Sequence, residues 1–121
     1  MQLIATIPNV FYEDLSVGLH LFIDGLGFEI SHDERPDNAF VVVKRNALKF
    51  HLVEDAEYAA KDRPEIRIET DDIDALYKEV ADRAPDLLHP NLREVTLRPW
   101  NAKEFSLLDE SNICLRIQQW V

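Results

Sequence analysis

One order of predicted elements occurs twice in this chain, and it limits the folds that the chain can adopt. Each half shows a short strand pattern, then a helical pattern, then three further strand patterns. In the first half these are Leu3–Ile7, Leu15–Leu26, Phe28–Ser31, Ala39–Val43 and Leu48–Val53. In the second half they are Ile66–Ile68, Ile73–Val80, Glu94–Leu97, Glu104–Leu108 and Ile113–Ile117. A repeat at a spacing of about 60 residues indicates two structural units of one kind.

The spacing of apolar residues predicts the type of each element. Leu15, Leu19 and Phe22 recur at the spacing of one helix face, whereas Ile113 and Leu115 alternate with polar residues as a half-buried strand does. Each half therefore offers one helix to cover one face of a four-stranded sheet. The other faces stay open, and two curved sheets side by side would form a groove, where small-molecule sites usually lie.

The length of 121 residues and a hydrophobic content of 46% suit a single domain with its own core. We predict one α+β domain over residues 1–121, with a first module at about 1–55 and a second at about 64–121. The charged, alanine-rich segment at about 56–63 is predicted to link them.

Charge and cysteine content exclude several classes of protein. Asp and Glu number 23 against 13 Lys and Arg, so the formal net charge is -10, which disfavours nucleic acid as a partner. No apolar run approaches the ~20 residues of a membrane helix, and the N-terminus lacks the plan of a signal peptide. One cysteine, Cys114, excludes an intramolecular disulfide and a cysteine-rich zinc site. We expect a cytoplasmic protein with no nucleic-acid or membrane partner.

Three segments carry a resemblance to a known superfamily. They are DLSVGLHLFIDGLGFEI (Asp14–Ile30), FHLVED (Phe50–Asp55) and RPWNAKEFSLLDESNICLRI (Arg98–Ile117). Together with the repeated order they resemble the vicinal oxygen chelate superfamily of glyoxalases, extradiol dioxygenases and bleomycin resistance proteins, and the bleomycin-resistance-like members most closely. The resemblance implies paired βαβββ modules forming a curved mixed sheet groove, and a homodimer that often exchanges a module between chains. Asn101 stands where the family usually has glycine.

The resemblance also implies four metal-ligand positions. They correspond to Thr6 or Ile7, His51, Glu65 and Arg116 in this chain. Only His51 and Glu65 could coordinate a metal, because a guanidinium group has no free lone pair and stays protonated. We therefore predict no metal and no cofactor, and expect Glu65 and Arg116 to form a charge-assisted bridge where the metal would sit. His51 is either a hydrogen-bonding neighbour of that bridge or a strand residue with local partners.

The resulting functional hypothesis is a metal-free small-molecule-binding protein that resembles bleomycin resistance proteins. It would sequester an aromatic ligand, which can also be cationic, in a groove at the dimer. The expected ligand-binding residues are His51, Glu65, Trp100, Arg116, Phe50 and Phe105. Stacking on aromatic rings and an acidic surface would suit such a ligand.

Two alternatives stay open. The first is a metal-dependent enzyme of the glyoxalase or dioxygenase type, hence a lyase or a dioxygenase, that uses His51 and Glu65. The second is a dimeric accessory protein without a ligand, in which Tyr58, Trp120 and Val121 serve the interface. Binding is favoured over catalysis. The Cys114 thiol is expected to be inert and half-buried rather than reactive.

Overall fold

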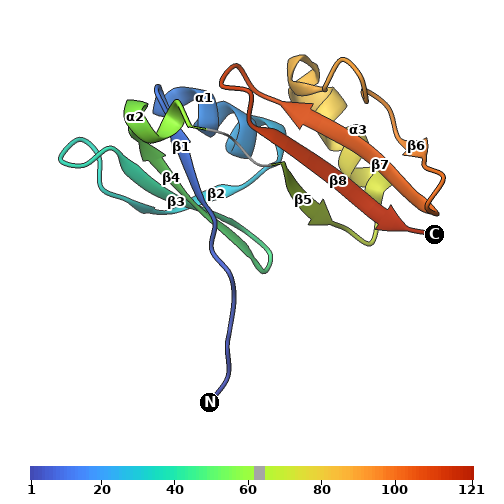
Figure 1. Cartoon of the computed structure of the whole chain (residues 1–121), viewed down its shortest axis with the longest axis horizontal. Helices are drawn as coiled ribbons and strands as arrows, with labels where there is room; N and C mark the ends of the chain where they lie inside the picture. Colours follow the sequence, from blue (N-terminus) through green and yellow to red (C-terminus); the bar gives the residue numbers. More distant parts are fainter. Residues whose placement is uncertain (62–64) are drawn as a thin grey trace.

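The computed structural model describes residues 1–61 and 65–121, and its chain forms two four-stranded mixed sheets side by side (Figure 1). The first sheet contains β1 (Asn9–Tyr12), β2 (Glu29–Asp33), β3 (Phe40–Arg45) and β4 (Leu48–Glu54). The second contains β5 (Ile66–Glu69), β6 (Thr96–Leu97), β7 (Ala102–Leu108) and β8 (Cys114–Trp120). The orders β1-β4-β3-β2 and β5-β8-β7-β6 are equivalent. The predicted α+β fold of two βαβββ modules is therefore confirmed.

Helices cover one face of each sheet. In the first module α1 (Leu15–Leu19) continues as the π-helix η1 (His20–Gly25), and its Phe22 ring packs against Phe50 of β4 with centroids 4.8 Å apart. In the second module α3 (Ile73–Arg83) packs its Tyr77 edge-on against Phe105 of β7 at 5.4 Å. Leu52, Ile73, Leu115 and Ile117 have no exposed surface. The core thus lies between each sheet and its helix, and the opposite face of each sheet remains available.

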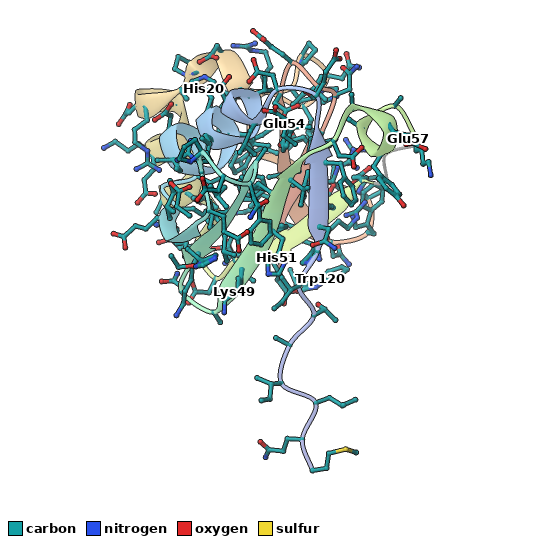
Figure 2. All side chains as sticks on the ribbon, turned by 90° about the vertical axis from the view of Figure 1, so that its left-hand side faces the viewer. His20, Lys49, His51, Glu54, Glu57 and Trp120 are labelled. Atoms are coloured by element: carbon teal, nitrogen blue, oxygen red, sulfur yellow. The ribbon has the colours of Figure 1, made fainter. Side chains whose placement is uncertain are left out.

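The first strand lies later in the chain than predicted. It comprises Asn9–Tyr12, whereas Leu3–Ile7 forms no strand and projects from the body of the molecule (Figures 1 and 2). Leu3 is 93% and Ile4 92% exposed. Pairing with β4 begins only at Pro8, whose carbonyl oxygen accepts a hydrogen bond from the His51 N–H at 3.0 Å. The local β-propensity of Leu3–Ile7 was misleading, because a strand also needs a neighbour to pair with.

Aspartate side chains cap the first turns of α1 and α3. The Asp14 carboxylate accepts the Ser16 N–H at 2.9 Å, and the Asp72 carboxylate accepts the Ala75 N–H at 3.1 Å. The segment expected to be a linker begins with a short helix, α2 (Ala56–Ala59), and its residues 62–63 lie outside the described residues. Among the described helices, none is long and apolar enough to cross a membrane.

The two modules are joined by polar contacts between distant parts of the chain. The buried Tyr12 hydroxyl of β1 donates to an Asp109 carboxylate oxygen at 2.7 Å, across 97 residues of sequence. Arg45 of β3 donates to Glu79 of α3 at 2.9 Å, and this contact lowers the pKa of the Glu79 carboxyl. Because these hydrogen bonds connect the modules, the positions of the two sheets relative to one another are defined by specific side chains.

Candidate functional site

The open face of the second sheet presents polar side chains from three neighbouring strands. Along β8, Leu115 and Ile117 point into the core, so Arg116 between them points to the other face. Arg116 pairs with Arg67 of β5 on one side and with Ser106 of β7 on the other. The Arg116 Nε donates to the Ser106 hydroxyl at 3.3 Å. The strand register therefore brings two guanidinium groups together on one surface.

A fully buried carboxylate, Glu104 of β7, lies beneath these guanidinium groups. Its Oε2 accepts hydrogen bonds from Arg67 Nη1 at 3.2 Å and from the Trp100 indole N–H at 2.8 Å. Its Oε1 accepts from Arg116 Nη1 at 3.5 Å. A charge with 0% exposure costs several kcal/mol unless it is paired, and here both oxygens have cationic or N–H partners.

Glu65 completes the group from the solvent side. Its Oε1 lies 3.1 Å from Arg116 Nε and 3.6 Å from Arg67 Nη2. The expected pair of Glu65 and Arg116 thus forms, although it joins positions on one sheet rather than spanning a groove. We call Glu65, Arg67, Trp100, Glu104 and Arg116 the arginine–glutamate cluster.

Trp100 adds an accessible aromatic ring to this cluster. The ring is held by its N–H on Glu104 and is 45% exposed. The Arg98 guanidinium carbon lies 4.9 Å from the ring centroid, a cation–π distance. Within the described residues Arg98 has no carboxylate partner, and its buried Nε has no hydrogen-bond partner. An uncompensated cation therefore lies beside the ring.

The open face of the first sheet is aromatic. Phe40 of β3 meets the His51 ring of β4 edge-on at 5.1 Å, and the Phe11 ring of β1 stacks on Tyr58 of α2 at 4.9 Å. His51 lies on β4, near the place where the N-terminal segment leaves the body (Figure 2). No contact among the described residues joins His51 to the arginine–glutamate cluster. The structure of this chain therefore brings Glu65, Arg116 and Trp100 together and keeps His51 apart from them.

Phe50 and Phe105 do not fit the groove-lining role expected of them. Phe50 is 3% exposed and packs against Phe22 and Phe28, and Phe105 has no exposed surface. The two-residue period of a strand explains this position, because Phe50 neighbours the open-face residue His51 and Phe105 neighbours Ser106. Both rings stabilise the core under the sheets.

The sequence interpretation overlooked Glu104 and Arg67 as site residues. A signal was present in the alternation of Glu104 and Ser106 with Phe105 and Leu107, which indicates a polar face on β7. Arg67 likewise lies between the apolar Ile66 and Ile68. The sequence could not predict the contact between Glu104 and Arg67, because 37 residues separate them.

The four positions that the resemblance assigns to metal ligands do not fit a divalent metal. Thr6 and Ile7 lie in the exposed N-terminal segment, and Arg116 contributes a fixed positive charge. The Glu65 carboxylate is engaged by Arg116. Across residues 1–61 and 65–121, no three His, Cys, Asp or Glu side chains gather as a metal site requires.

Cys114 lies on the same face as Arg116 and is partly buried. Burial is the main cause that raises the pKa of its thiol, with the Glu65 carboxylate adding to the effect. A raised pKa keeps the thiol protonated near neutral pH, and the thiolate is the reactive form. This direction favours the inert thiol expected from the sequence.

One cavity is separate from the arginine–glutamate cluster. It has a volume of about 450 Å³ and lies between the modules, lined by the end of η1, the β3–β4 turn and the start of α3. Leu26, Phe28 and Leu76 form part of its wall. It contains none of the six ligand-binding residues predicted from the sequence. The candidate site is thus a surface of the second sheet and not an enclosed pocket.

Two βαβββ modules with this strand order form the glyoxalase/bleomycin resistance fold, as the vicinal oxygen chelate resemblance implied. A bleomycin-binding protein from bleomycin-producing Streptomyces verticillus, solved with copper(II)-bleomycin, matches with a TM-score of 0.73 and 22% identity over 97% of this chain and 96% of its own. The bleomycin resistance determinant encoded on transposon Tn5 matches with a TM-score of 0.73 and 18% identity, covering 96% of this chain and 97% of its own.

A glyoxalase/bleomycin resistance protein/dioxygenase from Nocardioides also shares the fold, with a TM-score of 0.73 and 15% identity over 100% of this chain and 85% of its own. Neither a protein-family model nor a curated protein sequence matches the chain. At these identities the structural likeness establishes the fold, and the functional argument must come from the side chains.

Proposed function

We propose that this chain is a cytoplasmic small-molecule-binding protein that holds an aromatic ligand on the open face of its second sheet. The observation that carries this proposal is the arginine–glutamate cluster. It contains two of the four positions that the resemblance assigns to metal ligands, Glu65 and Arg116, and it presents paired charges beside the exposed ring of Trp100. Such a surface can stack a planar ring and hydrogen-bond its substituents, without any bond being made or broken.

The ligand groove would be completed by a second copy of the chain. Each chain carries an aromatic open face around Phe11, Phe40 and His51 and a charged open face around Arg116. Apolar side chains near the two chain ends are exposed, with Leu3 93%, Trp120 58% and Val121 75% exposed. Exposed apolar and aromatic side chains of this kind suit an interface. A homodimer would cover these side chains and set an aromatic face near a charged one.

Bleomycin is the first ligand to test. Two of the structural neighbours are described as bleomycin-binding proteins in complex with bleomycin. A protein that sequesters such an antibiotic protects the cell by lowering the free concentration of the drug. The same surface suits other planar compounds, so the proposed class is an aromatic small molecule and bleomycin its first example.

Fluorescence titration can test the proposal directly. The chain has two tryptophans, so the Trp120→Phe variant leaves Trp100 as the reporter. We expect bleomycin to change the Trp100 emission in a saturable way, and Trp100→Ala to weaken bleomycin binding measured by isothermal titration calorimetry. Isothermal titration calorimetry with Arg116→Gln should show weaker binding with the fold intact by circular dichroism. Unchanged affinity in Arg116→Gln would remove the cluster from the binding site.

Analytical ultracentrifugation tests the dimer. We expect the full chain to sediment as a dimer and the Trp120→Asp variant to shift toward the monomer, because a charge at the interface must be desolvated. Glu57→Gln, at an exposed position on α2, is the matched surface control. A monomer at all concentrations would contradict a groove shared between two chains.

A further inference from the structure

We propose that the ligand of the arginine–glutamate cluster carries an acidic group, a carboxylate or a phosphate, which takes the place of Glu65 on Arg116. This inference rests on the proposed binding function and adds the chemical class of the ligand, which is an aromatic acid in place of the cationic aromatic compound expected from the acidic composition. Its basis is a difference between the two carboxylates of the cluster: Glu104 is fixed and inaccessible, whereas Glu65 is accessible and exchangeable.

Glu104 holds the two arginines in place from below. It has 0% exposure and contacts Arg67 Nη1 at 3.2 Å and Arg116 Nη1 at 3.5 Å. Gln118 and Ser106 provide further acceptors, for Arg67 Nη1 at 2.9 Å and for Arg116 Nε at 3.3 Å. The guanidinium groups are therefore oriented before any ligand arrives, which reduces the entropy lost on binding.

Glu65 meets the same arginines from the solvent side. Its side chain is 38% exposed, and the contacts to Arg116 at 3.1 Å and Arg67 at 3.6 Å involve one carboxylate oxygen. Exposed ion pairs contribute little stability, so another anion can displace this carboxylate at small cost. Once Glu65 leaves, two guanidinium groups face the single negative charge of Glu104, and the exposed edge of the cluster is positive.

Two further observations favour an acid on an aromatic ring. The Trp100 N–H and Arg67 Nη1 bind the same Glu104 oxygen, so the indole lies beside the guanidinium groups. Arg98 adds a positive charge at 4.9 Å from the Trp100 ring, with no carboxylate partner in the described part of the chain. A ring stacked on Trp100 would thus lie close to cationic groups that can bind an acidic substituent. The formal net charge of -10 describes the whole molecule, whereas the cluster together with Arg98 holds three guanidinium groups and two carboxylates.

The test uses four matched probes that share one benzene ring: benzoate, phenyl phosphate, benzyl alcohol and benzylamine. The protein is the full chain, and the readout is the Trp100 indole N–H signal in nitrogen-15 NMR titrations, assigned by its absence from the spectrum of Trp100→Phe. We expect benzoate or phenyl phosphate to shift this signal at lower concentration than the alcohol or the amine. Comparison of the two anions tells whether the site prefers a carboxylate or a phosphate.

The direction in which Glu65→Gln changes benzoate affinity is the decisive result. Removing the competing carboxylate should tighten benzoate binding about fivefold, the upper range for an exposed ion pair. Glu69→Gln is the matched control, because Glu69 ends β5, the strand that begins directly after Glu65, and is exposed but has no arginine partner among the described residues. It should change affinity much less. Arg116→Lys should weaken binding of the anion while keeping a positive charge near Glu104.

The outcomes separate this inference from the proposed function. Tighter binding of benzylamine than of benzoate, or equal effects of Glu65→Gln and Glu69→Gln, would overturn the acidic-group assignment and leave aromatic binding in place. If none of the four probes nor bleomycin shifts the Trp100 signal in either the parent or Glu65→Gln, the binding function itself is wrong. If benzoate binds more tightly to Glu65→Gln but not to Glu69→Gln, the result supports both the acidic-group assignment and the binding function.

Discussion

At the scale of single residues, Glu104 links the stability of the second sheet to its candidate site. Its carboxylate is the common acceptor for Arg67, Arg116 and the Trp100 indole, and it has no exposed surface. Breaking a buried charge pair is costly because the remaining partner is left unpaired. Here the arginines are partly exposed, so water can solvate them again and reduce the cost.

Glu104→Gln should therefore lower the free energy of unfolding by about 2 kcal/mol. Urea denaturation followed by circular dichroism measures the change. The matched control is Glu69→Gln, which removes an exposed carboxylate from the same sheet and should stay within about 0.5 kcal/mol of the parent. Equal stabilities of the two variants would mean that Glu104 contributes nothing through its buried contacts.

At the scale of elements, the tight turn before β7 depends on an unusual backbone conformation. Asn101 has a φ of 64°, in the left-handed region that glycine adopts most easily. The turn is closed by hydrogen bonds from the Asn101 N–H to Arg98 O at 3.0 Å and from the Val121 N–H to Asn101 O at 2.9 Å. Asparagine tolerates this conformation better than other non-glycine residues, which explains how it stands where the family usually has glycine.

Asn101→Gly should leave stability within about 0.5 kcal/mol of the parent, because glycine tolerates a positive φ. Asn101→Val should cost about 1–2 kcal/mol, since a branched Cβ is strained there. Thermal unfolding measures both. Asn91→Val at an exposed loop position without a positive φ is the control. A stable Asn101→Val variant would contradict the importance of this turn, and its binding properties would tell whether Trp100 keeps its place.

The elements also show how far the sequence alone could lead. The strands β3, β4, β7 and β8 and the helix α3 were predictable because their apolar residues repeat with periods of two or 3.6. The position of strand β1 was not predictable. Asn9–Tyr12 forms this strand because it pairs with β4 and because Tyr12 contacts Asp109, 97 residues away. Local propensity favoured Leu3–Ile7, which has no partner strand among the described residues.

The candidate site could be predicted only in part for the same reason. Glu65 and Arg116 were expected to pair because the resemblance placed both near the metal position, and they do pair. Glu104 was overlooked because its partners come from β5, β8 and the turn at Trp100, a convergence that depends on strand register. Phe50 and Phe105 were assigned to the groove by their ring chemistry, while the alternation along their strands places them in the core.

At the scale of the whole molecule, His20 is a contact between the two modules whose strength depends on pH. Its Nδ1 lies 2.8 Å from Asp24 of η1, and its Nε2 lies 2.8 Å from Asp86 of η2 (Pro85–Leu87) in the second module. The hydrogen bond to Asp24 and then that to Asp86 raise the pKa of His20 above its usual 6.5. The contact between His20 and Asp86 joins η1 to η2. His20 lies at the opposite end of the body from His51 (Figure 2).

The direction of the pKa shift determines when this contact stabilises the fold. Because the pKa of His20 is higher in the folded chain, protonation favours folding, and the full contribution is present below pH 6.5. The contribution is lost as the pH rises through the raised value of the folded state. Asp86→Asn should therefore reduce the free energy of unfolding more at about pH 5.5 than at about pH 9.

Urea denaturation of the parent and of Asp86→Asn at both pH values measures this difference. Asp82→Asn is the control, because it removes an exposed carboxylate near the same end of α3 that has no histidine partner among the described residues. Its effect should not grow at the lower pH. If Asp86→Asn lowers stability equally at both pH values, neutral His20 bridges the aspartates as well as the cation does. The modules would then be held together at this point by hydrogen bonding alone, and their contact would not respond to pH.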